Sequence, residues 1–380
     1  MTLRRVKILQ LQNYYNVSAS DLAEQIIQAL PAEDYDVTTA FLNGHPGPDE
    51  PASRAERSVY FNLGESAFRG LRLRLISRLY RHCRTERYDA VIAHRFKPVN
   101  AMLLINRLLP FRACIGVAHG FGEYDRPSRR WLTRALMAPH WRTVGVSRAV
   151  CTYLIDSHAG FTQENTRQIN NAIDIRRAES IQHHRSRARE LLGLPKDAFI
   201  LGTIGRLVPV KGHIHLLNAF ATIKDESPGA VVGIIGEGRS RSDLEKQIAA
   251  RGLDRRVHLL GARNDALQFV KAFDVFVMPS MSEGLPLALL EGMTARIPVI
   301  GSDIPSLLPI LEDCGGHIFA AGQYTSLARC LSEVIELSPE QRREEGERAY
   351  RYLCHAHAIE DFRRKYRELL EELLSLSDRH

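Results

Sequence analysis

The chain has 380 residues, of which 44% are hydrophobic and 25% charged, a composition typical of a folded protein of about two domains. The N-terminus lacks the apolar region and small-residue cleavage site of a signal peptide, and no stretch approaches about 20 apolar residues. The six cysteines lack C-x-x-C spacing, which argues against a zinc site and against a disulfide framework. We therefore expect a cytoplasmic protein without membrane spans.

The net charge of +7 belongs to the first half of the chain. Residues 1–175 hold 23 Lys and Arg against 16 Asp and Glu, whereas residues 176–380 hold 28 of each. This asymmetry predicts an anionic partner for the first half, such as a membrane surface or a phosphorylated lipid. No nucleic-acid recognition motif accompanies the charge, so we expect no nucleic-acid partner.

The first half alternates short β-branched segments with amphipathic stretches, which is typical of a parallel α/β fold. Asp21–Leu30 has helical spacing, and Glu24 lies three residues after Asp21, as in a capping box. The predicted strands of this half are Val6–Gln12, Val37–Leu42, Ala90–Ala93, Cys114–Ala118, Thr143–Val146 and Arg167–Ile169.

The segment Ala67–Arg87 predicts a basic amphipathic helix. Its apolar residues stand at 68, 71, 75, 76, 79, 80 and 83, and arginines stand at 69, 72, 74, 78, 81, 84 and 87. Such a helix can lie in an anionic membrane interface, or it can pack on a core and keep its arginines in solvent. Both interpretations remain open at this point.

The second half repeats the α/β alternation after a polar segment without apolar periodicity, Asn170–Pro195, which places a domain boundary near residues 171–177. Its predicted strands are Phe199–Ile204, Val231–Ile235, Val257–Leu260, Val275–Met278 and Pro298–Ile300, and its predicted helices are Lys211–Lys224, Asp243–Arg251, Asp265–Ala272 and Pro286–Ala295. We expect two doubly wound domains, each with its ligand crevice at the carboxyl ends of the strands.

A cationic motif follows the first strand of the second half. In Gly202-Thr-Ile-Gly-Arg-Leu-Val-Pro-Val-Lys-Gly212, Gly205 is expected to allow a tight turn, while Arg206 and Lys211 bring two cations to a helix N-terminus. Arginine binds phosphate oxygens through its fork, and lysine adds a point charge. The motif predicts a diphosphate site.

An acidic motif, Glu283-Gly-Leu-Pro-Leu-Ala-Leu-Leu-Glu291, follows the strand Val275–Met278. If both glutamates were helical, eight residues would separate them by about 12 Å, whereas the two carboxylates of a glycosidase lie roughly 5–9.5 Å apart. The spacing suits two parts of an extended ligand rich in hydroxyl groups.

Together, G-R-L-x-x-x-K-G and E-x7-E about 70 residues later resemble the motifs of the GT-B glycosyltransferases of family 4. The resemblance is strong from Phe199 to Gly316 and looser from Val6 to Asp174. It implies an acceptor-binding domain (1–174) and a donor-binding domain (175–357) that face each other across a cleft. It further implies a C-terminal helix (358–380) that packs back toward the N-terminal domain.

The resemblance also implies roles for individual residues. Arg206 and Lys211 would bind the diphosphate of the donor, Glu291 the ribose hydroxyls, and Glu283 the donor sugar. The backbone at Gly284, Leu285 and Leu287 would lie under the sugar and phosphate. His119 matches a family histidine near the sugar. The alternative interpretation is that His119 has only a structural role. The chain departs from the family in the first loop, Gln12–Ser18, which lacks the usual glycine pair.

Other motifs are weaker. Asp34-Tyr-Asp36 precedes its strand and is expected to form a surface turn, so we expect no metal and no other cofactor. Gly236-Glu-Gly238 resembles a family turn, and the segment lacks the third glycine of a dinucleotide fingerprint.

The sequence therefore predicts a retaining, metal-independent glycosyltransferase. It would move a sugar from a nucleotide-diphosphate sugar, UDP-linked in our interpretation, to a lipid-linked or cell-envelope glycan such as lipopolysaccharide core. It would act in the cytoplasm or at the cytosolic face of the inner membrane. The alternatives are a sugar-nucleotide epimerase on the same fold and a catalytically silent, membrane-associated sugar-nucleotide-binding subunit.

Overall fold

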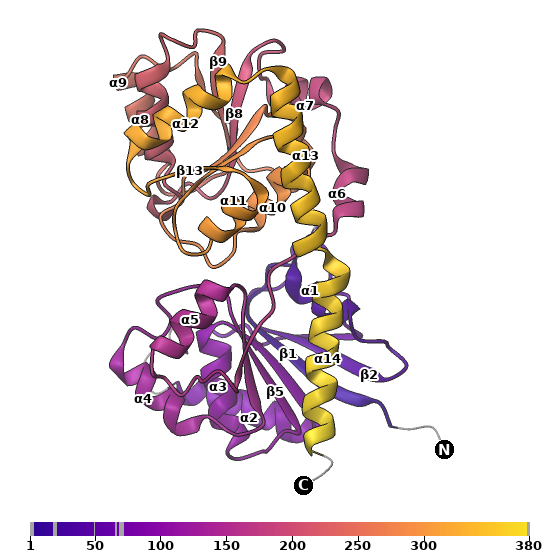
Figure 1. Ribbon diagram of the computed structural model, residues 1–380. Coiled ribbons are helices and arrows are strands. Elements are labelled where there is room, and N and C mark those ends of the chain that lie inside the picture. The colour runs from indigo at the N-terminus through magenta and orange to yellow at the C-terminus, as the bar shows by residue number, and fades with distance from the viewer. Residues whose placement is uncertain (1–3, 18–20, 49, 65–66, 68–71, 378–380) are drawn as a thin grey trace. The chain divides into compact units, whose positions relative to one another are not determined.

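The computed structural model describes residues 4–17, 21–48, 50–64, 67 and 72–377. The chain divides into two compact units. The N-terminal unit comprises Met1–Asn171 together with Ile359–His380, and the C-terminal unit comprises Ala172–Ala358. Each unit is an α/β fold built on one parallel sheet (Figure 1).

The sheet of the N-terminal unit has the strand order β3-β2-β1-β4-β5-β6-β7, and all its neighbouring strands are parallel. The order reverses between β1 and β4, so the topological switch point lies between these two strands. The strands are β1 (Val6–Tyr14), β2 (Tyr35–Asn43), β3 (Arg57–Tyr60), β4 (Ala90–His94), β5 (Ala113–Ala118), β6 (Trp141–Gly145) and β7 (Thr166–Gln168).

Helices connect these strands, and the last helix of the chain completes the unit. The helices are α1 (Leu22–Gln28), α2 (Leu73–Glu86), α3 (Phe96–Asn106), α4 (Pro127–Leu136), α5 (Arg148–Asp156) and α14 (Ile359–Ser377). Helix α14 packs against α1 and β5 and is drawn in yellow in Figure 1. The Nε of Arg363 donates to Oε1 of Gln25 at 3.0 Å, which joins α14 to α1.

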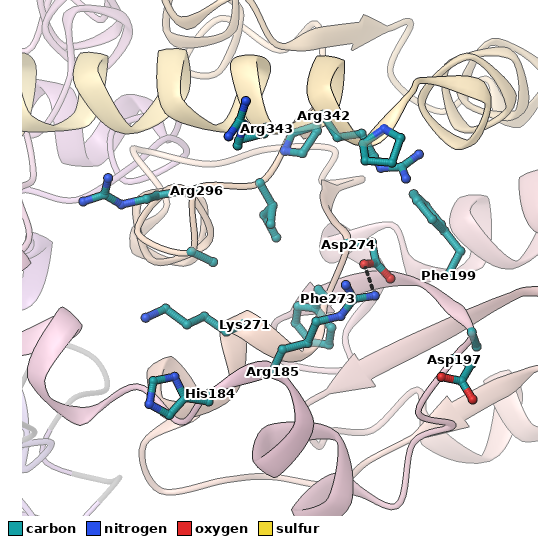
Figure 2. A pocket seen from close by; sticks show the side chains of 15 residues that line it. His184, Arg185, Asp197, Phe199, Lys271, Phe273, Asp274, Arg296, Arg342 and Arg343 are labelled. Carbon is teal, nitrogen blue, oxygen red and sulfur yellow. Dashed lines mark ion pairs between the residues drawn. The ribbon is translucent and has the colours of Figure 1, made fainter.

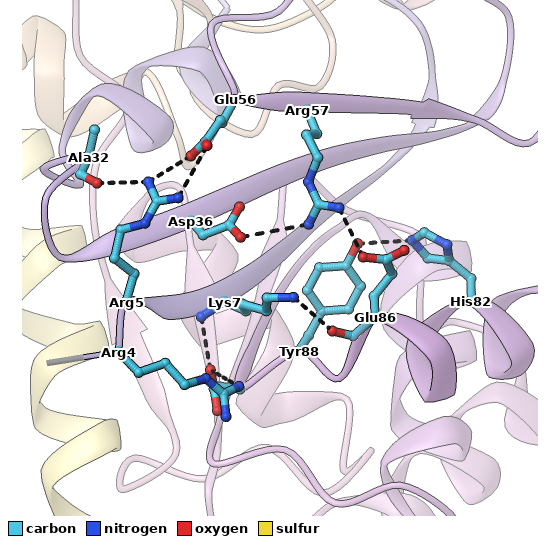
Figure 3. A network of polar contacts seen from close by, with 11 residues as sticks. Arg4, Arg5, Lys7, Ala32, Asp36, Glu56, Arg57, His82, Glu86 and Tyr88 are labelled. Atoms are coloured by element: carbon cyan, nitrogen blue, oxygen red, sulfur yellow. Dashed lines mark hydrogen bonds and ion pairs between the residues drawn. The ribbon is translucent and has the colours of Figure 1, made fainter. Parts of the chain in front are cut away.

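The amino ends of β1–β3 hold the C-terminal end of α2 (Figure 3). Arg57 pairs with Glu86 at 2.9 Å and with Asp36 at 3.7 Å, and Nζ of Lys7 donates to the carbonyl oxygen of Glu86 at 3.3 Å. His82 and Tyr88 share a further hydrogen bond of 2.9 Å. Asp36, part of the Asp34-x-Asp36 motif, therefore lies at the start of β2 and belongs to a structural network.

The sheet of the C-terminal unit has the order β10-β9-β8-β11-β12-β13, again entirely parallel, with the reversal between β8 and β11. Its strands are β8 (Phe199–Ile204), β9 (Ala230–Ile235), β10 (Val257–Leu259), β11 (Val275–Met278), β12 (Val299–Ser302) and β13 (His317–Phe319). Its helices are α6 (Ile175–Ile181), α7 (Arg185–Leu192), α8 (His213–Ile223), α9 (Arg241–Ala250), α10 (Leu287–Met293), α11 (Leu308–Cys314), α12 (Tyr324–Glu336) and α13 (Pro339–Ala356).

A cavity of about 520 Å³ opens at the amino ends of β8, β11 and β12 (Figure 2). Asp274, directly before β11, accepts from the guanidinium groups of Arg185 at 2.6 Å and Arg189 at 2.7 Å. Its carboxylate also accepts from the backbone amide of Ile200 at 2.7 Å. Arg189 is 1% exposed, so this network fastens α7 to the sheet at the edge opposite the strands' carboxyl ends.

The structure confirms all eleven predicted strands and shows two that the patterns missed, β3 and β13. These two strands lie at sheet edges and have four and three residues. The helix predicted at Asp265–Ala272 is present as a 3-10 helix, η3 (Ala266–Ala272). The predicted capping box is wrong. The Glu24 carboxylate accepts from Ser53 and Arg54, so Asp21 caps α1 without the reciprocal bond of a capping box.

Candidate donor-binding site

The two motifs of the C-terminal unit lie next to each other because their strands do. The cationic motif follows β8 and the acidic motif follows β11, the pair at which the strand order reverses. The backbone amide of Met281 donates to the carbonyl oxygen of Val210 at 2.8 Å and joins the two loops directly. The carboxyl ends of strands at such a reversal are where open α/β sheets bind ligands.

Gly212 makes this contact between the loops sterically possible. Its φ is +67°, and a Cβ at this position would lie 1.8 Å from the carbonyl oxygen of Pro279. The expectation for Gly205 is wrong, because its φ is not positive and a Cβ there would meet side chains at an ordinary 3.7 Å. Glycine is required at Gly236 instead, because a Cβ there would lie 1.9 Å from the Gly205 carbonyl oxygen.

Lys211 and Glu283 form an ion pair within this site. Nζ of Lys211 lies 2.6 Å from Oε1 of Glu283, and the two side chains are 17% and 12% exposed. The hydroxyl of Ser280 donates to the same carboxylate oxygen at 2.7 Å. Ser280 is in turn fixed by Ser302, whose hydroxyl donates to the Ser280 carbonyl oxygen at 2.5 Å. Lys211 thus carries a charge that Glu283 already balances.

Arg206 lies beside a pocket of about 670 Å³ lined by the loop after β8 and the turn after β9. The backbone amide of Leu207 donates to the carbonyl oxygen of Glu237 at 2.8 Å, which holds the two segments together. Arg206 is exposed, and within the described ranges its guanidinium makes no hydrogen bond or ion pair. It is therefore a cation available to an anion in this pocket.

Glu291 lies in α10 and is partly buried. Burial raises its pKa to about 7, the nearby charge of Asp265 adds to this rise, and Arg177 opposes it. Arg177 and Asp265 themselves form an ion pair of 2.5 Å. Arg177 lies in α6, whose N-cap Asp174 accepts from the Arg177 backbone amide at 2.9 Å. Helix α6 therefore places a cation beside Glu291.

The remaining predicted donor residues lie between the two glutamates. Gly284 and Leu285 are buried in the turn that follows Glu283, and Leu287 is the first residue of α10. Arg206, Lys211 and Glu283 thus lie in the segments that directly follow the two central strands of one unit, and Glu291 lies in α10, the helix that follows β11. This arrangement offers cations for phosphates and carboxylates for hydroxyl groups.

His119 belongs to the N-terminal unit, where it follows β5. Its Nε2 lies 3.2 Å from Nδ1 of His94, the last residue of the neighbouring strand β4. Burial lowers the pKa of His119 well below its usual value, with additional contributions from His94 and Arg95. Burial and Arg95 likewise lower the pKa of His94 to about 3. Both imidazoles are therefore neutral at neutral pH.

Sequence reasoning missed Ser280, His94 and the Arg177–Asp265 pair. Ser280 and His94 could have been found, because each stands at the carboxyl end of a predicted strand, where functional side chains gather. The pair could not have been found, because its two residues are 88 positions apart and meet only in the folded unit.

Two family profiles match the chain. The profile described as "Glycosyl transferases group 1" matches residues 184–372, and the one described as "Glycosyltransferase Family 4" matches residues 20–177. The chain belongs to the family 4 glycosyltransferases. The fold is accordingly GT-B, with two Rossmann-like domains.

Two named relatives show how much of the chain the sequence similarity covers. One is the "UDP-Gal:alpha-D-GlcNAc-diphosphoundecaprenol alpha-1,3-galactosyltransferase" of Escherichia coli, 28% identical over 60% of each chain. The other is the "Lipopolysaccharide core biosynthesis glycosyltransferase LpsE" of Rhizobium meliloti, 30% identical over 39% of this chain and 42% of that protein. The chain thus matches less than two thirds of either relative.

Solved structures resemble the whole chain more fully. Anabaena Alr3699/HepE, crystallised in complex with UDP, matches with a TM-score of 0.79 and 18% identity over 97% of this chain and 100% of that one. Sucrose-phosphate synthase from Thermosynechococcus elongatus matches with a TM-score of 0.82 and 17% identity over 98% and 100%. At these identities the likeness shows the shared fold.

Proposed function

We propose that the protein is a glycosyltransferase that takes its donor sugar from a nucleoside diphosphate, UDP in particular. The acceptor is a hydroxyl of a lipid-linked or cell-envelope glycan such as lipopolysaccharide core. The observation that carries this proposal is the set of Arg206, Lys211, Glu283 and Glu291 at the carboxyl ends of β8 and β11. Structures of HepE with UDP and UDP-glucose support the choice of donor.

In this proposal the cations act on the leaving group. When the sugar–phosphate bond breaks, negative charge develops on the diphosphate, and Arg206 stabilises it from the side of its pocket. Phosphate oxygens compete with Glu283 for the Lys211 ammonium group. The Glu283 carboxylate then remains bonded to Ser280 and accepts from hydroxyl groups of the donor sugar.

We further propose that the anomeric configuration is retained and that no metal takes part. A leaving phosphate oxygen would receive the acceptor's proton, so that the new glycosidic bond forms on the face from which the diphosphate departs. Among the described residues, no group of three or more His, Cys, Asp or Glu side chains is arranged to hold a metal ion. An NMR assignment of an inverted product anomer would contradict retention.

The test is a donor screen followed by a transfer assay. UDP-glucose, UDP-galactose, UDP-GlcNAc and their GDP counterparts are compared by thermal shift, because a ligand that binds the native state raises its apparent stability. The donor that gives the largest shift is then incubated with a cell-envelope glycolipid extract. Transfer of its labelled sugar supports the proposal, whereas conversion of the donor to its epimer without acceptor supports an epimerase.

Helix α2 is the segment for which the sequence suggested contact with an anionic membrane. Its apolar residues Leu75, Leu79 and Cys83 are at most 3% exposed and pack in the unit's core, which supports the interpretation of a core-packed helix with its arginines in solvent. Residues 68–71 of the predicted segment lie outside the described residues. In the described ranges, no helix is long and apolar enough to cross a membrane.

The opposite face of α2 remains available for an electrostatic contact. Its exposed arginines are Arg74, Arg78, Arg81 and Arg84. We propose that this arginine face holds the protein at the anionic, cytosolic face of the inner membrane, where a lipid-linked acceptor would be found. Each basic residue near such a surface contributes about 1 kcal/mol.

A further inference from the structure

Three arginines gather near the carboxyl ends of β4 and β5 in the N-terminal unit. Arg72 precedes α2, Arg95 follows β4, and Arg129 lies in α4. The guanidinium carbons of Arg72 and Arg129 lie 5.6 and 4.4 Å from the centre of the Phe96 ring. Burial and the repulsion from Arg129 both lower the pKa of Arg72. The positive charges of Arg72 and Arg129 are therefore held close together, and their repulsion costs folding free energy.

Glu123 is the carboxylate that faces this group, and it balances the cluster poorly. Burial raises its pKa, although the Phe96 amide, Arg95 and Arg129 act in the opposite direction. Nη1 of Arg129 donates to the backbone carbonyl oxygen of Glu123 at 2.9 Å. Oε2 of Glu123 is buried and has no hydrogen-bond partner among the described residues. Three arginines beside one carboxylate leave an excess of positive charge, which favours an anionic ligand.

Arg95 has a backbone conformation that side chains rarely adopt. Its φ is 67° and its ψ 166°, a region populated almost entirely by glycine and costing about 1–3 kcal/mol for other residues. Its amide donates to the Val117 carbonyl oxygen at 2.8 Å, which fixes it between β4 and β5. The side chain is exposed and, in the part of the chain that the structure describes, forms no hydrogen bond or ion pair. Strain of this kind concentrates at functional sites.

The same edge of the sheet carries the neutral pair His94 and His119. His94 is only 5% exposed, and its buried Nε2 has no hydrogen-bond partner among the described residues. A neutral imidazole forms hydrogen bonds with hydroxyl groups, and arginines form them with phosphate oxygens. The switch point of this sheet lies beside β4, where a ligand of the unit is expected.

We propose that Arg72, Arg95 and Arg129 bind a phosphate group of the acceptor, so that the acceptor is a phosphorylated molecule that also carries the reacting hydroxyl. This inference rests on the proposed function, because it specifies the acceptor of that reaction. The phosphate can belong to a lipid diphosphate or to a phosphorylated sugar, and both present the same charged oxygens to the cluster.

Calorimetric titration of the full chain, with UDP present at saturation, separates these sources. The probes are farnesyl diphosphate and glucose 6-phosphate, with farnesol and glucose as their uncharged counterparts. We expect at least one phosphorylated probe to bind at least tenfold more tightly than its counterpart. The phosphorylated probe that binds more tightly shows whether the phosphate belongs to a lipid diphosphate or to a phosphorylated sugar. Equal affinity for both members of each pair would overturn the inference.

The variants Arg95→Gly and Arg129→Gln should each weaken binding of that probe at least tenfold and leave UDP binding unchanged. Arg95→Gly should also keep or raise the melting temperature, because glycine adopts φ 67° without strain. Arg134 is an exposed arginine further along α4, and Arg134→Gln should change neither probe binding nor UDP binding. Unchanged probe binding in Arg95→Gly and Arg129→Gln would contradict the assignment. A wild-type protein that fails to bind UDP in the absence of probe would contradict the proposed function instead.

Discussion

Nζ of Lys211 lies 2.6 Å from Oε1 of Glu283, although the two residues are 72 positions apart in the chain. The pair joins the loop after β8 to the loop after β11, and both side chains are largely buried. Loss of one partner leaves the other charge buried and uncompensated, which costs more than loss of both.

The first prediction concerns this pair. Lys211→Met and Glu283→Gln should each lower the free energy of unfolding by about 1–3 kcal/mol, whereas the double variant should lose less than the sum of the two. Urea denaturation of the four proteins measures the coupling directly. Strict additivity would show that the pair contributes no interaction energy. All three variants should lose transfer activity, because the site then lacks its cation, its carboxylate or both.

The second prediction concerns Arg206. Because its side chain is exposed and unpaired among the described residues, Arg206→Ala should change unfolding stability by at most about 0.5 kcal/mol. Loss of a charge-assisted phosphate contact should weaken UDP binding about 10- to 100-fold. Arg343→Gln is the matched control, since Arg343 is also exposed and lines the cavity at the opposite edge of the same sheet. Equal UDP affinity in both variants would remove Arg206 from the site.

The third prediction follows from the raised pKa of Glu291, about 7 against an ordinary 4.5. The native state holds this proton more tightly than the unfolded state, so stability falls as the pH rises from about 4.5 to 7. Glu291→Gln should remove that loss and be more stable than the wild type by roughly 1–3 kcal/mol at pH 8, with little difference at pH 4. Thermal melts across this pH range measure the effect.

The same variant separates stability from function. UDP binding by the wild-type protein should strengthen as the pH rises through 7, because the ionised carboxylate accepts more effectively from the ribose hydroxyls. Glu291→Gln should bind UDP more weakly at pH 8 and lack this pH dependence. A variant that is stabilised but binds UDP as the wild type does would place Glu291 outside the donor site.

The fourth prediction concerns Gly212. Its φ of +67° and the 1.8 Å approach of an added Cβ to the Pro279 carbonyl oxygen mean that Gly212→Ala must displace one of the two site loops. We expect a loss of about 3 kcal/mol in unfolding free energy together with loss of UDP binding. Gly229→Ala is the control, since a Cβ there meets no atom within 4 Å. Similar melting temperatures for the two variants would refute this account of the loops.

The fifth prediction tests the arginine face of α2. Replacing Arg74, Arg81 and Arg84 by Gln should reduce cosedimentation with vesicles containing anionic lipid and should not alter binding to neutral vesicles. The control replaces three exposed arginines of the C-terminal unit, Arg255, Arg329 and Arg343. If the wild-type protein sediments with neither kind of vesicle, the membrane proposal fails.

Much of the fold could be predicted because its signals are local. β-branched runs marked the buried parallel strands, whose side chains need apolar surroundings on both faces. The cationic and acidic motifs that follow two of these strands predicted the candidate donor site, because open α/β sheets bind ligands at strand ends where the strand order reverses. Helix α2 shows the limit of such signals: its spacing revealed an apolar face, but only packing showed that Leu75 and Leu79 belong to the core.

The sequence by itself determined the fold class, the family motifs and the residue types available for phosphates and hydroxyl groups. The tertiary structure decided which of these charges meet: Lys211 with Glu283, Arg177 with Asp265 beside Glu291, and three arginines around Phe96. The reason is physical. Strand and helix patterns depend on neighbours a few residues away, whereas charge pairing and burial depend on distances that only the folded chain sets.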